Sequence, residues 1–116
     1  MAWEPISEAK LLEAIEAAEF AMQPCELASW CRIRIRPVKW PLSPWGDLGG
    51  GFWVVAVMGQ HCIWFNDIED GFNASSFTAF GTIGEYGCNQ AELDECIRWY
   101  CQDFMRELLP RHKEQE

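Results

Sequence analysis

Few side chains of this sequence combine the chemistry and the spacing that catalysis requires. His61 and Cys62 are neighbours in a run that predicts a β-strand, and adjacent side chains of a strand point to opposite faces of a sheet. They therefore cannot act together as a base and a nucleophile. The other histidine, His112, lies in a polar C-terminal tail. A catalytic dyad would need the fold to bring His61 to Cys88 or Cys101. We favour His61 as a polar strand residue and expect no enzymatic activity.

Motifs that bind metals or phosphate groups are also missing from the sequence. No two of its cysteines have the Cys-x-x-Cys spacing of zinc and redox sites. Asp67, Glu69 and Asp70 beside Gly71 resemble half a calcium loop. The frame of a calcium-binding EF-hand loop, however, puts Ile68 and Phe77 at ligand positions. The glycines at 49–51 lack the Lys-Ser/Thr of a phosphate-binding loop. We expect neither a metal ion nor a cofactor.

An acidic turn is the first candidate for a binding site. Asp67, Glu69 and Asp70 follow a predicted hairpin, and Trp64 and Phe72 flank them. Carboxylates suit a basic protein surface, and the two rings could supply the apolar centre that an interface needs. The alternative is a solvated turn with both rings in the core.

A basic segment is the second candidate. Residues 30–36 (WCRIRIR) alternate between apolar and charged side chains, which predicts a half-buried strand with Arg32, Arg34 and Arg36 on one face. Three guanidinium groups in a row could bind the phosphate or carboxylate of a ligand. They could also pair with carboxylates of a neighbouring strand or helix, which we favour.

The composition favours a protein partner over nucleic acid or a membrane. Nine basic residues stand against 18 acidic ones, for a formal net charge of -9. This charge repels nucleic acid and anionic lipid, and attracts a basic protein. Seven Trp and seven Phe are many for a small core, so some rings could line an interface. The alternatives are a dense aromatic core and a charge that serves solubility.

The start of the chain and its cysteines favour the cytoplasm. Residues 1–10 have no basic start followed by an apolar run, and the longest apolar run, at 52–58, is too short to span a membrane. An even number of cysteines could form disulfides in a secreted protein. Since several, including Cys31 and Cys62, lie in core-like patterns, we expect reduced thiols.

Two helices are expected at the ends of the chain. Ser7 is a good N-cap for a helix that ends before Pro24, and its apolar stripe comprises Leu11, Ile15, Ala18 and Met22. The last helix is expected to start at Asn89, with Glu92 completing a capping box, and to continue to Pro110.

The strongest signal for strands is a hairpin. Residues 52–58 and 61–66 flank Gly59-Gln60, which suits a type II′ turn. The expected register pairs Val57 with Cys62, and Val55 with Trp64. Both faces are apolar, so we expect the hairpin at the centre of a sheet.

The remaining segments complete the expected fold. Residues 66–73 have the composition of a turn, and residues 77–86 could hold another strand. We therefore predict one α+β domain over residues 1–116: an N-terminal helix, a three- to four-stranded, mainly antiparallel sheet, and a C-terminal helix packed on the sheet. Residues 110–116 are expected to form a frayed tail.

Residues 53–92 resemble small bacterial immunity-type proteins of polymorphic or contact-dependent toxin systems. The resemblance rests on the hairpin, the turn WFNDIEDGFN and the stretch EYGCNQAEL. It implies a small acidic cytosolic protein that neutralises a toxin by capping its active site or a nearby surface. One alternative is an acidic secretion chaperone, a dimer that holds an extended client. Another is a small enzyme or ligand-binding domain that uses Arg32, Arg34 and Arg36.

Overall fold

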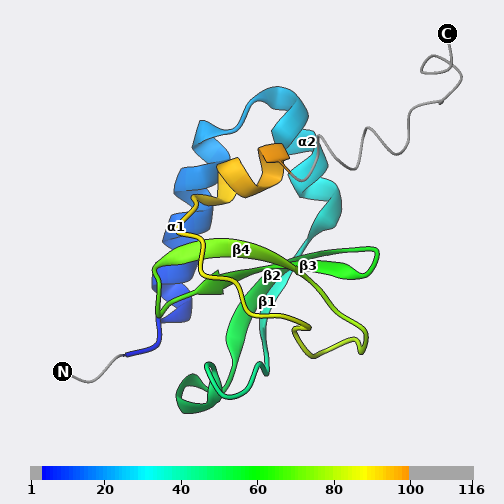
Figure 1. The fold of residues 1–116 in the computed structure, drawn as a ribbon. Coiled ribbons are helices and arrows are strands. Elements are labelled where there is room, and N and C mark those ends of the chain that lie inside the picture. Colours follow the sequence, from blue (N-terminus) through cyan, green and yellow to red (C-terminus); the bar gives the residue numbers. More distant parts are fainter. Residues whose placement is uncertain (1–3, 100–116) are drawn as a thin grey trace, which may run out of the picture.

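The computed structural model describes residues 4–99 and has helices on one face of an antiparallel sheet (Figure 1). The strands lie in the order β1-β2-β3-β4. The elements are α1 (Glu8–Ala21), α2 (Pro24–Ile33), β1 (Arg34–Trp40), the short 3-10 helix η1 (Asp47–Gly49), β2 (Phe52–Met58), β3 (His61–Asn66), β4 (Gly71–Ser76) and a helix over residues 93–99. The predicted α+β fold is confirmed. The expected tail and the distal part of the last helix lie outside the described residues.

Both faces of the sheet carry an apolar core. The helix-side core joins the stripe of α1 to Trp30 of α2, to the sheet and to the last helix. The loop-side core lies under the segments 41–51 and 77–90; its buried members are Trp40, Leu42, Phe52, Val54, Cys62, Trp64, Phe77 and Ile83. The central hairpin is therefore covered on both sides, as its two apolar faces predict.

The start of α1 agrees with the sequence prediction. Ser7 caps the helix, and its hydroxyl accepts a hydrogen bond from the Lys10 backbone N–H at 3.2 Å. All four predicted stripe residues, Leu11, Ile15, Ala18 and Met22, are buried.

The second helix, α2, was not predicted, and it corrects the expected strand over residues 30–36. Pro24 begins α2 instead of only ending α1, because a proline costs nothing at the first position of a helix, where its missing N–H has no partner anyway. The helix continues to Ile33, so Arg32 is helical and β1 starts at Arg34.

A bulge changes the register of the central hairpin. Gly59 has φ of 59°, as the first position of a type II′ turn requires, and Val57 pairs with Cys62 as predicted. Beyond the bulge, Trp64 pairs with Val54, so the predicted pair with Val55 is wrong. The extra residue in β2 lets Val55 and its neighbour Ala56 both enter the helix-side core.

The fourth strand lies inside the segment that was predicted to be a turn. Only residues 67–70 form the turn, and β4 follows directly. Its polar side chains are buried but bonded: the Asn73 amide donates to Asn89 O at 3.1 Å, and Ser75 Oγ accepts from Trp64 Nε1 at 2.9 Å. The strand expected over residues 77–86 is absent from the described structure, where this segment is a loop.

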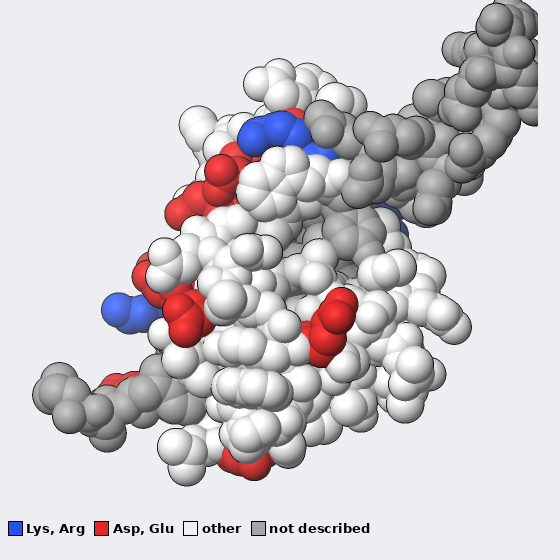
Figure 2. Space-filling model, in the orientation of Figure 1, with Lys and Arg blue, Asp and Glu red and all other residues white. Residues whose placement is uncertain are grey.

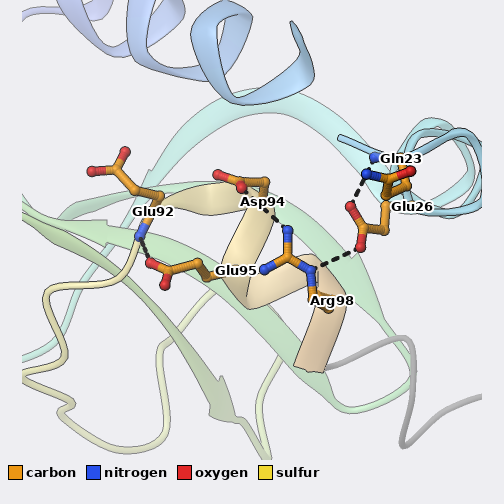
Figure 3. Close-up of polar contacts among 6 residues, drawn as sticks. All are labelled: Gln23, Glu26, Glu92, Asp94, Glu95 and Arg98. Atoms are coloured by element: carbon orange, nitrogen blue, oxygen red, sulfur yellow. Dashed lines mark hydrogen bonds and ion pairs between the residues drawn. The ribbon is translucent and has the colours of Figure 1, made fainter. Parts of the chain in front are cut away.

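The last helix begins later than predicted. Asn89 is not its N-cap, because Asn73 Oδ1 accepts the Asn89 N–H at 2.9 Å and Phe72 N–H donates to Ala91 O at 2.9 Å. These bonds hold residues 89–91 extended beside β4. The capping contact comes one turn later, where a carboxylate oxygen of Glu95 accepts the Glu92 N–H at 2.9 Å (Figure 3).

A buried carboxylate joins α2 to the last helix (Figure 3). Glu26 accepts the Gln23 N–H at 2.9 Å with one oxygen and Arg98 Nε at 2.9 Å with the other. Arg98 also pairs with Asp94, at 3.4 Å. The hydrogen bond from Gln23 and that from Arg98 lower the pKa of Glu26, against the opposing effect of burial.

Replacing Glu26 by glutamine is expected to destabilise the fold in a pH-dependent way. A carboxyl with a lowered pKa contributes stability above its ordinary pKa of 4.5, and this contribution is lost as the pH falls through its folded pKa. At neutral pH, Glu26→Gln should cost about 1 kcal/mol, since Arg98 is partly exposed. The difference in the free energy of unfolding between the variant and the native protein should disappear in acid. Denaturant unfolding over a pH series measures it, with the exposed Glu13→Gln as control; equal stability at neutral pH would refute the role of Glu26.

Candidate partner-binding site

The acidic turn is held in one shape by Asn66. This side chain is buried, and its oxygen accepts the N–H groups of Ile68 and Glu69 at 3.0 and 3.2 Å. Its amide donates to Gly87 O at 2.7 Å, which ties the turn to the long loop before the last helix. Asp70 has φ of 63°, a left-handed conformation that Asp and Asn tolerate. The turn is therefore preorganised.

Asp67 connects this turn to the N-terminal segment. One of its carboxylate oxygens accepts the Ile6 N–H at 2.8 Å, and Trp53 Nε1 donates to Ile6 O at 3.3 Å. Burial raises the pKa of Asp67, an effect that the Ile6 N–H and the charge of Lys39 oppose. Asp67 thus positions the chain beside the turn.

The turn and the N-terminal segment together form an open cleft of about 450 Å³. Its lining comprises Glu4, Pro5, Ile6, Ser7, Lys10, Asp67 and Asp70. The lining thus includes three acidic residues, one basic residue and the apolar residues Pro5 and Ile6. Of the three predicted carboxylates, Asp67 and Asp70 line the cleft and Glu69 does not. Glu4 was not predicted, because nothing in its local sequence indicates that it lies near the turn. We call this surface the acidic cleft.

The two aromatic anchors expected beside the turn are core residues. Trp64 has 0% exposure and Phe72 has 3%. Trp64 lies in the loop-side core, and Phe72 packs against Phe65 in the helix-side core. Neither ring can contact a partner, because β3 and β4, the strands that carry them, are covered. The prediction that the two rings form the centre of an interface is therefore wrong.

The three arginines do not form one cationic row. Arg32 lies on α2, while Arg34 and Arg36 lie on β1. Arg34 donates to a carboxylate oxygen of Glu19 at 2.6 Å and lies over the Trp30 ring, with its guanidinium carbon 5.4 Å from the centroid. Pairing with a helix carboxylate, the favoured interpretation, is thus correct for Arg34. The expectation that Arg32, Arg34 and Arg36 lie in one row on a strand is therefore wrong.

A second surface, formed by the loops that cover the sheet, has exposed aromatic rings. Phe80 is 76% exposed and contacts Trp40 edge-on with centroids 5.0 Å apart. Trp45 is 45% exposed and stacks on Tyr86 with centroids 4.4 Å apart. Leu48 is 90% exposed. We call the exposed side chains of residues 41–51 and 77–86 the loop face.

The sequence contains a signal for this surface that was overlooked. Segments 40–51 and 76–91 contain two carboxylates, Asp47 and Glu85, and no lysine or arginine. In Figure 2, acidic side chains gather along one side of the molecule and much of the central surface is uncharged. Aromatic loops with so little charge are typical of binding surfaces as well as of cores.

His61 and Cys62 are neighbours on β3 but differ in exposure. His61 is exposed and Cys62 is buried, and burial raises the pKa of the Cys62 thiol to about 12, which suppresses the reactive thiolate. Within residues 4–99 no group of three or more His, Cys, Asp or Glu side chains could hold a metal ion. None of the helices described there is long and apolar enough to cross a membrane.

Thiol labelling of the native protein should separate two classes of cysteine. Cys25, Cys31 and Cys88 are free and exposed, which corrects the expectation that Cys31 is a core residue. Cys62 and Cys96 are free and buried, with thiol pKa values raised to about 12. The buried pair should be alkylated at least about a hundredfold more slowly, since the thiolate fraction is small. Peptide mapping after brief alkylation measures this, and equal rates in denaturant provide the control. Fast native labelling of Cys62 would contradict the fold.

Comparisons with known proteins give no relative from which a function could be transferred. The chain matches no protein-family model, no curated protein and no solved structure. Its function is therefore inferred from the acidic cleft and the loop face.

Proposed function

We propose that this chain is a non-catalytic binding domain of immunity type, which neutralises a basic toxin partner by capping its surface. The acidic cleft is the observation that carries the proposal: its lining contains three acidic residues, Glu4, Asp67 and Asp70, and one basic residue, Lys10. Opposite charges on two proteins steer them together and exclude acidic partners. The net charge of -9 extends this attraction beyond the cleft.

The proposed setting is the cytoplasm. The free thiols of Cys25, Cys31, Cys62, Cys88 and Cys96 support it, because free cysteines are typical of a reducing compartment. A toxin neutralised there would be held in a one-to-one complex, without any bond being made or broken.

The association rate with the partner tests this function. The partner would be captured with the native chain as bait, identified, and produced in pure form. The variant Glu4→Gln/Asp70→Asn removes two charges from the cleft and leaves Asp67 to hold Ile6. Asparagine tolerates the left-handed backbone at position 70. At low ionic strength the variant should associate about three- to tenfold more slowly. The two rates should converge at high salt, where the charges are screened.

A matched variant separates the cleft from net charge. Glu13→Gln/Glu16→Gln also removes two negative charges, but from the exposed face of α1. It should associate nearly as fast as the native protein. If the cleft variant binds at the native rate at every salt concentration, or if both variants slow binding equally, the acidic cleft is not the docking site.

A further inference from the structure

The loop face has the rigidity of a preformed binding surface. A backbone hydrogen bond ties its two loops together: Ile83 N–H donates to Pro41 O at 3.1 Å. Within the first loop, Gly51 N–H donates to Gly46 O at 2.8 Å. Below it, the buried ring of Trp40 contacts both Phe77 and Phe80. Exposed rings on such a base lose little freedom when a partner covers them, which favours binding.

Trp45 is a partly exposed ring at this surface. One face of the ring stacks on Tyr86, with an angle of 17° between the ring planes. Among residues 4–99, no second ring and no cation lies against Trp45. The indole face is electron-rich and attracts cations, and tryptophan does so better than the other aromatic residues.

Two acidic residues lie close in sequence to the stacked rings of Trp45 and Tyr86. Asp47 follows Trp45 by two residues, and the Ser43 hydroxyl donates to one of its oxygens at 2.6 Å. Glu85 precedes Tyr86 and accepts a hydrogen bond from the Ser76 hydroxyl at 3.5 Å. Both acidic residues are exposed. The nearest cation in sequence, Lys39, has partners of its own: its ammonium donates to Gly49 O, in the same loop as Asp47, at 2.5 Å and lies over Trp53. Among residues 4–99, neither Asp47 nor Glu85 forms an ion pair, so the loop face combines an aromatic ring with two carboxylates.

We propose that the loop face binds an arginine side chain of the basic protein partner, with its guanidinium on Trp45 and its N–H groups directed to Asp47 or Glu85. Arginine fits better than lysine because its planar group stacks on an aromatic ring while donating to a carboxylate at its edge. This assignment rests on the proposed function, since it names the chemistry of the same partner. The cleft attracts the partner at long range, and the loop face recognises one residue at contact.

A short peptide with several arginines, and a matched peptide with lysines in their place, test the proposal. The indole N–H signal of Trp45 in a ¹⁵N NMR spectrum is expected to shift on addition of the arginine peptide. Trp45→Ala should weaken the binding of the arginine peptide about tenfold, and Asp47→Asn/Glu85→Gln should weaken it about threefold. The lysine peptide should bind more weakly and lose less with Trp45→Ala. Glu13→Gln/Glu16→Gln is the charge-matched control for the double variant and should stay near native.

The outcomes separate this proposal from the proposed function. If the arginine peptide binds without shifting the indole N–H signal of Trp45 and without losing affinity in Trp45→Ala, the arginine site is wrong. In that case charge-driven docking at the acidic cleft still stands. Equal binding of the lysine peptide, with an equal loss in Trp45→Ala, would refute the preference for arginine. Self-association that Phe80→Ala abolishes would also overturn the proposal, because a second copy would then cover the loop face. If no peptide binds and the cleft variant still slows the partner's association, only the arginine site fails.

Discussion

Replacing Trp64 by alanine is expected to lower the free energy of unfolding by about 3–5 kcal/mol, the cost of removing a buried large aromatic side chain. The Trp64 ring has no exposed surface, and its indole N–H donates to Ser75 at 2.9 Å. The change leaves a cavity against Phe52, whose ring centroid is 4.8 Å away, and removes the partner of a buried hydroxyl. Denaturant unfolding followed by circular dichroism gives the value.

The control for this variant is an exposed ring of the same side of the sheet. Phe80→Ala should cost at most about 1.5 kcal/mol, the value of an aromatic pair contact, since Phe80 is 76% exposed. If Trp64→Ala costs no more than Phe80→Ala, Trp64 is not a core residue, and the original prediction of an interface anchor would return.

Replacing Gly71 by alanine is expected to cost about 3 kcal/mol or more, at or above the upper end of the usual cost of overpacking. A Cβ atom at this position would overlap the Gln90 backbone and lie 2.5 Å from the Asn89 carbonyl oxygen. These are backbone atoms, so no side chain can turn aside. Segment 89–91 would have to leave β4, and the bond between Phe72 N–H and Ala91 O would be lost.

A second glycine supplies the matched control. Gly59 has φ of 59°, but a Cβ there would meet nothing within 4 Å. Gly59→Ala should therefore cost only about 1–2 kcal/mol, for the left-handed backbone alone. Unfolding both variants in denaturant compares a steric clash with a conformational cost. If Gly71→Ala is no worse than Gly59→Ala, segment 89–91 is not packed against β4 as described.

Local signals predicted those parts of the fold that local chemistry controls. The cap at Ser7 and the turn at Gly59 depend on residues within one turn of the chain, and both predictions are confirmed. Long-range pairing overrode local signals elsewhere. Asn89 is a good N-cap by type, but Asn73 engages its N–H across the sheet. The polar residues of β4 led to the prediction of a turn, because their buried hydrogen-bond partners lie far away in the sequence.

The candidate site could be predicted only in part, for the same reason. The carboxylates of residues 67–70 are visible as a cluster, but Glu4 joins them only because Asp67 captures Ile6, 61 residues away. Whether a ring is buried or exposed depends on which segment covers it, so the sequence could not distinguish Trp64 from Trp45. The bulge that places Val55 and Ala56 on one face likewise has no local signature.

Hydrogen exchange of the chain, alone and bound to its partner, tests the central claim most directly: a basic protein docks on the acidic cleft. Binding is expected to slow exchange in residues 4–10 and 67–71, which line or border the cleft. An additional slowing in residues 41–51 and 77–86 would accompany contact at the loop face. The contradicting result is slower exchange confined to α2 and β1, with residues 4–10 and 67–71 unchanged.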